Sequence, residues 1–228
     1  MTPWKQELER KLAEPGAPAA LPFTALARAA YIARGKPIPD PTLHAWLTDA
    51  IARRRLESVI RGLYLNRFTS PGGRLADAVP FLRRDAIVSL HTALDEAGLY
   101  NNPPSGVTAI VPLDPGPTRP RTGRVDTKQG PVFVRAMPRR LLEAGEPDDR
   151  IDHARSVAHP QATPEKALLD WLYLATSPRS NLAPPAPHDV DISQLDRRRL
   201  NRLAKQMGLE GALHRWLDGN LLTRSSAT

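Results

Sequence analysis

The chain has 228 residues, which is enough for one large domain or two small ones with a real hydrophobic core. It carries 32 Lys and Arg against 24 Asp and Glu, and the resulting net charge of +8 suits a polyanionic partner, either nucleic acid or an anionic membrane face. The absence of cysteine excludes disulfides, cysteine-ligated zinc and thiol catalysis. Because the sequence shows neither a signal-peptide pattern nor a run of about 18 apolar residues, we expect a cytoplasmic protein.

The first 70 residues predict three helices followed by a hairpin. Helices are expected over residues 4–13, 23–34 and 41–54, and strands over residues 56–60 and 63–66. Asp40 is the predicted N-cap of the third helix, with Pro41 at its first position, and Gly62 tolerates the positive φ of the hairpin turn. This order is that of a winged helix-turn-helix, whose third helix lies in the major groove of DNA.

The third predicted helix has one apolar and one polar face. Its apolar side gathers Leu43, Leu47, Ala50 and Arg54, flanked by Trp46 and Ile51. Its opposite side gathers Thr42, Ala45, Thr48, Asp49 and Ala52, flanked by Arg53 and Arg55. Small residues let the helix approach base edges, and hydroxyls and arginines bind bases or phosphates, so this face is suited to reading DNA.

Six residues are therefore candidates for contacts with double-stranded DNA: Lys36, Thr42, Thr48, Arg53, Arg55 and Arg61. Lys36 precedes the third helix and suits a phosphate, while Arg61 at the hairpin tip suits a minor groove or a phosphate. The first 70 residues carry 11 basic and 6 acidic side chains, so most of the excess charge lies there. The alternative for Arg53 and Arg55 is an ordinary solvated helix C-terminus, where cations complement the helix dipole.

The remainder of the chain predicts a mixture of strands and helices. Strands are expected over residues 107–111 and 132–134, and helices over residues 85–96, 164–174, 194–207 and 211–217. Asp85 and Thr163 are the predicted N-caps of the first two helices. The chain is therefore expected to adopt an α+β fold, with one domain over residues 1–70 and a mixed α/β domain over residues 71–228.

Three segments come in an order that resembles a known family. They are the hairpin Val59–Tyr64, the stretch Asp85–Leu94 with the later Gly98-Leu99, and Ala162–Leu174. They are similar to the arginine-glycine-tyrosine wing, the Ser-Leu-x-x-Ala-Leu helix ending in Gly-Leu, and the Pro-Glu-[Lys/Arg]-Ala-Leu-Leu-Asp helix of the AbiEi antitoxins of type IV toxin–antitoxin systems. The resemblance covers roughly residues 40–217. The chain departs from the family in its longer segment before residue 40 and in Arg53-Arg54-Arg55, where a glycine is common.

The resemblance implies a winged-helix DNA-reading domain joined to a mixed α/β antitoxin domain. It further implies that the protein represses its own operon through inverted repeats in the operator DNA. The second implied partner is a nucleotidyltransferase-like toxin, which the protein would neutralise.

A second basic surface is a candidate on the predicted helix 194–207. It consists of Arg197, Arg198, Arg199, Arg202 and Lys205, with Leu195, Leu200, Leu203 and Met207 on the opposite side. We expect the four arginines to be largely exposed, because the chain offers few nearby acids. The stripe is either a solvated face or a contact with DNA, RNA or a toxin.

The sequence predicts no catalytic, metal or cofactor site, and hence no enzyme. Ser89 and His91 lie two apart on an expected helix and so face away from one another, and no two histidines are four residues apart. Asp189 and Asp191 lack a preceding Gly-Ser on a helix, and we interpret them as a loop. The rival hypotheses are a stand-alone winged-helix regulator without a toxin and a nuclease fused to a winged helix.

Overall fold

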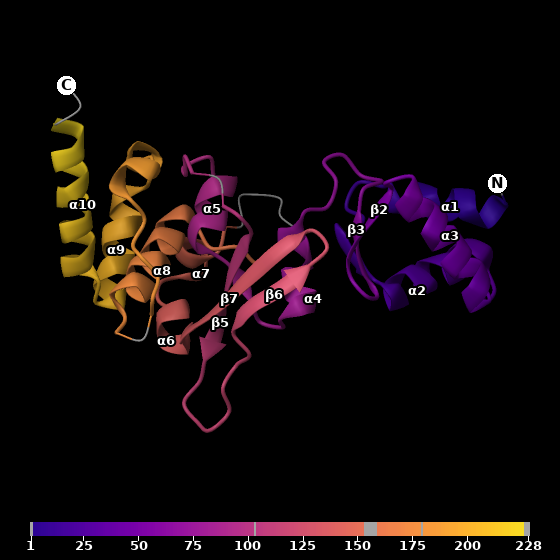
Figure 1. Cartoon of the computed structure of the whole chain (residues 1–228), viewed down its shortest axis with the longest axis horizontal. Helices are drawn as coiled ribbons and strands as arrows, with labels where there is room; N and C mark the ends of the chain where they lie inside the picture. The colour runs from indigo at the N-terminus through magenta and orange to yellow at the C-terminus, as the bar shows by residue number, and fades with distance from the viewer. Residues whose placement is uncertain (1, 103, 153–158, 179, 226–228) are drawn as a thin grey trace. The chain divides into compact units, whose positions relative to one another are not determined.

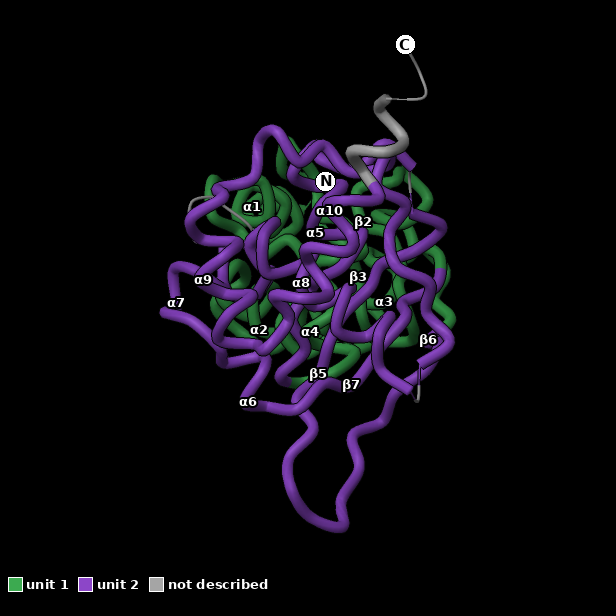
Figure 2. The backbone as a smooth tube through the Cα atoms, turned by 90° about the vertical axis from the view of Figure 1, so that its left-hand side faces the viewer, with its two compact units in different colours: residues 1–84, 126–130 green, residues 85–125, 131–228 purple. Residues whose placement is uncertain are grey.

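The computed structural model describes residues 2–102, 104–152, 159–178 and 180–225, with side chains described as far as residue 219. The chain forms two compact units (Figure 2). Unit 1 comprises residues 1–84 and 126–130, and unit 2 comprises residues 85–125 and 131–228. Helices together with two separate β-sheets make this an α+β fold, as the sequence predicts.

Unit 1 contains three principal helices and a small sheet (Figure 1). Its elements are α1 (Pro3–Leu12), β1 (Ala20–Pro22), α2 (Phe23–Arg34), α3 (Asp40–Ala52), β2 (Leu56–Ile60), β3 (Leu63–Asn66) and α4 (Val79–Leu82), with a 3₁₀ turn over Leu75–Ala78. The strands are antiparallel in the order β1-β3-β2. One core unites the three helices with the sheet, from Leu8 and Leu12 on α1 through Leu26 on α2 and Trp46 on α3 to Leu56 on β2.

The side chain of Asn66 joins three parts of unit 1. It is fully buried, and its Nδ2 donates to the carbonyl oxygens of Leu12 at 2.8 Å and Pro18 at 3.1 Å. Its Oδ1 accepts from the backbone N–H of Phe68 at 3.0 Å. Each polar atom of the amide is thus satisfied, and the end of α1 and the loop before β1 are fixed to the end of β3.

The predictions for unit 1 hold for its long elements. The bounds predicted for α2, β2 and β3 are confirmed, and Gly62 has the positive φ (80°) expected in the hairpin turn. The prediction of Asp40 as N-cap is wrong, because α3 already begins at Asp40 and Pro39 takes the cap position. Strand β1 was not predicted, since three residues are too few for a periodic pattern.

Unit 1 extends beyond the predicted boundary at residue 70. Gly73 donates its backbone N–H to the carbonyl of Asn66 at 2.6 Å, and a Cβ at this position would lie 2.0 Å from the Ala19 carbonyl oxygen. The 3₁₀ turn that follows contacts both β1 and β3. The chain therefore stays with unit 1 until residue 84.

Unit 2 is a mixed α/β domain. Its elements are β4 (Ile87–Val88), α5 (Leu90–Glu96), β5 (Val107–Leu113), β6 (Gly123–Thr127), β7 (Gly130–Pro138), α6 (Arg139–Leu142), α7 (Pro147–Arg150), α8 (Pro164–Thr176), α9 (Arg197–Met207) and α10 (Glu210–Ser225), with 3₁₀ turns over Pro187–Asp189 and Ile192–Gln194. The sheet order is β4-β5-β7-β6, with β4 antiparallel and β7 parallel to β5. Helices α8, α9 and α10 pack against one another (Figure 1).

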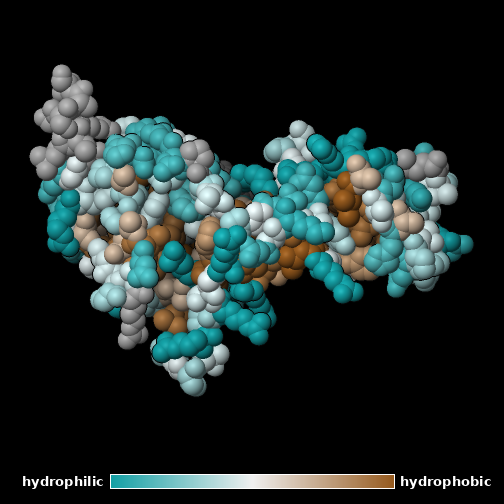
Figure 3. All heavy atoms as spheres, in the orientation of Figure 1, coloured by the Kyte–Doolittle hydropathy of each residue, from teal (hydrophilic) through white to brown (hydrophobic). Residues whose placement is uncertain are grey.

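Most large apolar side chains are buried, although Tyr31, Ile32, Ile60 and Phe81 are exposed. Hydrophilic residues cover most of the face seen in Figure 3. In unit 2 one cluster of buried side chains joins α5, α8, α9 and α10 with the sheet, and includes Leu94, Ile110, Leu168, Leu203 and Leu213. The loop between β5 and β6 projects away from this sheet (Figures 1 and 2).

Two helix starts in unit 2 differ from the prediction. Asp85 was predicted to cap a helix, but it has a left-handed φ of 62°, and Ile87 and Val88 form a strand that pairs with Ile110 and Ala109. The helix begins only at Leu90, five residues after the predicted cap. Strand pairing with β5 outweighs the local helical pattern here.

The helix predicted over residues 194–207 begins later than the sequence analysis placed it. Helix α9 starts at Arg197 instead of Gln194, because the Asp196 carboxylate accepts the backbone N–H groups of Arg198 at 2.8 Å and Arg199 at 3.1 Å. The predicted cap at Thr163 is confirmed, since its hydroxyl accepts from the Lys166 N–H. Strand β6 was not predicted, because its largely exposed residues show no apolar alternation.

Replacing Asn66 by aspartate should destabilise unit 1 by about 1–3 kcal/mol. The substitution keeps the shape of the side chain, but it replaces the donor that serves the Leu12 and Pro18 carbonyls by an acceptor. Urea unfolding followed by circular dichroism measures the effect. Asn101→Asp, at an exposed position of unit 2, is the matched control, and equal midpoints for the two variants would contradict the role assigned to Asn66.

Candidate nucleic-acid interface

Helix α3 has the two faces predicted from its sequence, except that Arg54, predicted on the apolar side, is exposed and lies beyond the helix end at Ala52 with a left-handed φ of 56°. Leu43, Trp46, Leu47 and Ala50 are buried in the core of unit 1, and Thr42, Ala45, Thr48, Asp49 and Ala52 are exposed. The exposed side offers short side chains along most of its length. This surface allows the helix backbone to come close to a partner.

The acidic side chain of Glu9 on α1 fixes the orientation of α3. Its Oε1 accepts from the indole N–H of Trp46 at 3.2 Å and from Nη2 of Arg53 at 3.2 Å. Trp46 is buried, so this bond holds one side of α3 against α1. Sequence reasoning missed Glu9; a glutamate on the opening helix carries no local signal of a contact 37 residues away.

Arg53, one of the predicted DNA contacts, is already engaged within the protein. Its guanidinium bonds both Glu9 and the Asp49 carboxylate one turn earlier on α3. Its side chain is 41% exposed, but a contact with DNA would have to compete with two acids. We therefore place Arg53 with the residues that support α3 rather than with those that present a free cation.

The other five predicted contacts lie at the surface of unit 1. Lys36, Thr42, Thr48, Arg55 and Arg61 are all exposed. The hydroxyl of Thr48 donates to the His44 carbonyl at 3.0 Å, so its oxygen is left to accept from a partner. The Arg55 guanidinium lies over the Phe68 ring, 5.8 Å from its centroid.

The hairpin presents Arg61 at its tip. Strands β2 and β3 pair as an antiparallel ladder, and Arg61 and Gly62 form the turn between them. The Gly62 carbonyl accepts the backbone N–H of Phe23, which fastens the turn to the start of α2 at 2.8 Å. Unit 1 thus brings a polar helix face and an arginine-tipped hairpin onto one small scaffold.

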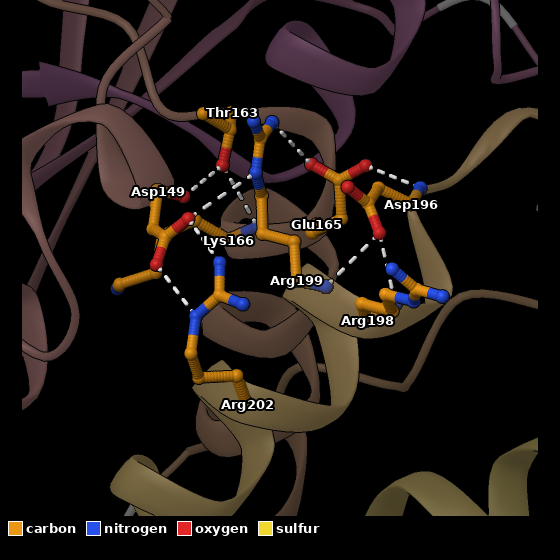
Figure 4. Close-up of polar contacts among 8 residues, drawn as sticks. All are labelled: Asp149, Thr163, Glu165, Lys166, Asp196, Arg198, Arg199 and Arg202. Carbon is orange, nitrogen blue, oxygen red and sulfur yellow. Dashed lines mark hydrogen bonds and ion pairs between the residues drawn. The ribbon is translucent and has the colours of Figure 1, made fainter.

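The second basic surface, in unit 2, divides into two groups. Arg197, Arg198 and Lys205 are exposed on α9, and their side chains form no ion pair with another described residue. Arg202 instead binds both oxygens of Asp149, at 2.9 and 2.6 Å (Figure 4). Arg199 lies 3.5 Å from Asp149 and 3.4 Å from Glu165.

The expectation of four largely exposed arginines is therefore wrong for Arg199, which is only 32% exposed. The acids that pair with α9 come from α7 and α8, which are distant in sequence and close in space. The opposite face of α9 is buried as predicted, through Leu200, Leu203 and Met207.

The Asp149 carboxylate is the centre of this network. The hydrogen bonds from Arg202 hold its pKa below the usual range against the opposing effect of burial, and the charges of Arg202 and Arg199 add to the lowering. Glu165 accepts the backbone N–H of Asp196 at 2.8 Å, which ties the start of α9 to the start of α8. Glu165 is thus a structural residue and is buried.

A second acid–base pair lies fully inside unit 2. Lys166 and Asp170, one turn apart on α8, form a buried ion pair, and the Ser89 hydroxyl donates to the other Asp170 oxygen at 2.8 Å. Burial raises the pKa of Asp170, while the charge and hydrogen bonds of Lys166 and the bond from Ser89 oppose that rise. Because Ser89 is also fully buried, these polar groups join α8 to the strand–helix junction at β4 and α5.

The remaining candidate sites give no metal cluster. Among the described residues no group of three or more His, Asp or Glu side chains could hold a metal ion, and His153 lies outside the described residues. Asp189 ends a 3₁₀ turn and Asp191 caps the next one by accepting the Ser193 N–H at 3.0 Å. None of the helices in the described part of the chain is both long and apolar enough to cross a bilayer.

The comparison with known proteins gives only distant structural likeness. No protein-family model matches the chain, and no curated protein matches it. Among solved structures, the chain is similar to the RV2827C protein from Mycobacterium tuberculosis, with 16% sequence identity and a TM-score of 0.48 over 90% of this chain and 72% of that one. What the protein does must therefore follow from its own residues.

Replacing Asp149 by asparagine should lower the melting temperature at neutral pH by a few degrees. A carboxyl with a lowered pKa contributes stability that is present above its unfolded pKa, near 4, and that is lost as the pH falls through the folded value. The melting temperature of Asp149→Asn should therefore decline less than that of the wild type between pH 5 and pH 3. Circular dichroism melts across this range measure both effects.

The neighbouring Asp148→Asn is the matched control, since Asp148 is exposed on the same short helix. Its melting curves should follow the wild type. If the two asparagine variants behave alike, the Asp149–Arg202 contact does not stabilise unit 2.

Proposed function

We propose that the protein is a DNA-binding transcriptional regulator that acts in the cytoplasm and represses its own operon. The observation that carries the proposal is the exposed face of α3, which presents short and mostly polar side chains while the other face of the helix is buried. A hairpin with Arg61 at its tip follows this helix. Three helices and an antiparallel hairpin come in the order of a winged helix-turn-helix. In that design α3 enters the major groove and the hairpin reaches the neighbouring groove or backbone.

The charges of unit 1 support a polyanionic partner. Lys36 precedes α3, Arg55 follows it, and Arg61 lies on the hairpin, so cations flank the polar helix face along the chain. Cations in this arrangement suit phosphates, whereas Thr42 and Thr48 suit base edges or phosphates. The operator is expected to contain inverted repeats, each read by one copy of the protein.

We further propose that the protein is an antitoxin that counteracts a nucleotidyltransferase-like toxin. This part rests on the resemblance of its three segments to the AbiEi family. Two of those segments meet in unit 2, where Ser89 of the Ser-Leu-x-x-Ala-Leu segment bonds Asp170 at the end of the Pro-Glu-Lys-Ala-Leu-Leu-Asp segment. A direct buried contact between the two motifs gives a physical reason for their occurring together in one chain. Arg197, Arg198 and Lys205 offer a second basic surface to a toxin or to nucleic acid.

The neighbouring reading frame separates the antitoxin from a stand-alone regulator. A neighbour that encodes Gly-Ser followed by Asp-x-Asp, as in nucleotidyltransferases, supports the antitoxin, and its absence favours the regulator alone. The rival nuclease requires metal-dependent cleavage of DNA by the purified protein. Cleavage that is abolished by replacing one acidic pair would establish that rival.

Replacing Thr42 or Arg61 by alanine should weaken binding to the protein's own promoter. The loss is expected to be about 1–3 kcal/mol if the residue contacts a base, and smaller if it contacts only phosphate. Binding of the wild type should also weaken steeply with salt, because phosphate contacts release counterions. Fluorescence anisotropy with labelled promoter DNA measures both. Arg10→Ala, which removes an exposed arginine of α1 that is paired with Glu7 and Glu14, is the charge-matched control. Equal affinities for the Arg10 and Arg61 variants would remove the hairpin from the interface.

The double variant Thr42→Ala, Arg61→Ala should lose repression and still rescue cells from the toxin. Both substitutions lie on the surface of unit 1, whereas the family-like antitoxin segments after the hairpin lie in unit 2. A promoter–reporter assay measures repression, and growth with the toxin expressed from an independent promoter measures rescue. Loss of rescue together with repression would show that DNA binding itself provides the protection.

A further inference from the structure

A cavity of about 660 Å³ opens within unit 2, between strands β6 and β7 and the C-terminal end of α8. Its apolar wall is formed by Leu113, Phe133, Val134 and Leu174. Its polar lining includes two arginines, Arg124 and Arg135, and the hydroxyl residues Tyr173, Ser177 and Ser180. Small-molecule sites are commonly clefts of about 300–1,000 Å³ with mostly apolar walls and a few polar groups, and this cavity has those properties.

The guanidinium of Arg135 is incompletely satisfied by the protein. Its Nε is buried and has no hydrogen-bond partner among the described residues, and no described acid forms an ion pair with it. The nearby His91 is not a counter-ion for Arg135. Burial lowers the pKa of His91 to about 4, and the charge of Arg135 adds to that lowering, so the imidazole is neutral at physiological pH.

A buried donor on a cation is costly unless an acceptor meets it. An arginine presents a planar fork that matches a carboxylate or a phosphate, and such charge-assisted pairs are among the stronger hydrogen bonds. The groups that line the cavity beside Arg135 are apolar, hydroxyl or cationic, and none is an acid. Because Arg135 itself lines the cavity and no acid lies beside it there, an anion for its guanidinium would come from a ligand.

The part of the lining that belongs to the end of α8 favours a different group. Helix α8 ends at Thr176, and a helix C-terminus carries partial negative charge. The Leu172 and Tyr173 carbonyls already accept from the Thr176 hydroxyl and the Leu174 carbonyl from the Ser177 N–H, so the helix end acts on a ligand through this partial charge and through the hydroxyl residues Tyr173 and Ser177 of the lining. A ligand with its anionic end on the strands would turn toward α8 an end that donates hydrogen bonds. Between the two ends, Phe133 and Leu174 offer surfaces for a ring or an aliphatic body.

We propose that this cavity binds a small organic anion, with a carboxylate or phosphate on Arg135, an apolar or aromatic body against Phe133 and Leu174, and a hydrogen-bond donor toward the end of α8. The site lies wholly within unit 2 and is separate from the residues assigned to DNA. Its occupancy is independent of whether the protein reads DNA.

The test is isothermal titration calorimetry of the full chain with three kinds of probe. Nucleoside 5′-monophosphates represent phosphate-bearing ligands, aromatic amino acids and indole-3-carboxylate represent carboxylates, and inorganic phosphate represents the charge alone. At least one organic anion should bind with a dissociation constant below about 1 mM, and inorganic phosphate should bind more weakly. The class that binds identifies the anionic group.

Variants of Arg135 connect binding to the site. Arg135→Met should weaken the binding of that probe about tenfold or more, and Arg135→Lys, which keeps the charge but not the fork, should restore part of it. The ligand-free Arg135→Met variant should melt no lower than the wild type, because the protein loses no hydrogen bond from Nε. Arg140→Met, at an exposed arginine of α6 that does not line this cavity, should bind like the wild type.

Three results would overturn the proposal. They are the failure of every organic probe to bind the wild type, binding of inorganic phosphate as tight as that of the organic anions, and equal affinities for Arg135→Met and Arg140→Met. Promoter affinity of the Arg135 variants without ligand is measured in parallel. If no organic anion binds but the promoter is still bound, the anion site is wrong and the proposed DNA-binding function stands. If the promoter is not bound, the proposed function is wrong independently of the anion site.

Discussion

The burial of one face of α3 is the constraint on which the proposed function depends. Leu43, Trp46, Leu47 and Ala50 enter the core of unit 1, and a helix with one buried face must present the other to solvent. Glu9 reinforces this orientation through Trp46. The composition of the exposed face, with threonines and alanines in place of long chains, then determines how near the backbone can come to a DNA groove.

Segments of unit 2 are joined by buried or partly buried ion pairs, whereas unit 1 is held together mainly by apolar packing. The pair Lys166–Asp170 with Ser89 lies inside the domain, and the Asp149–Arg202 contact lies at its edge. A buried ion pair is weak evidence for stability on its own, because desolvation offsets much of the attraction. Removing one partner is costly all the same, since the other charge is left buried, so these contacts fix which segments meet.

The sequence predicted those helices and strands whose pattern and end signals lie within the segment itself. Helix α2 and the hairpin β2–β3 have periodic patterns and clear ends at Gly35 and Gly62, and the faces of α3 and α9 follow from spacing alone. The α+β class followed from the same patterns. Strand β1 and strand β6 lack such a pattern, because one is very short and the other lies at the sheet edge with exposed residues.

The candidate site was predictable only in part, because partners distant in sequence decide which cations are available. Nothing near Arg53 in the sequence indicates Glu9, and nothing near Arg199 indicates Asp149 and Glu165. Arg61 could be predicted, since a turn residue beside a glycine is exposed for local reasons. The cavity around Arg135 gave no sequence signal, because its walls come from separate strands and a helix end.

Hydroxyl-radical and methylation footprinting of the protein on the DNA upstream of its own operon test the central claim most directly. The account predicts protected major-groove guanines within two inverted repeats, with protected backbone beside each repeat where the hairpins lie. Protection that is uniform along the DNA, or absent at concentrations that saturate binding, would contradict a sequence-reading α3.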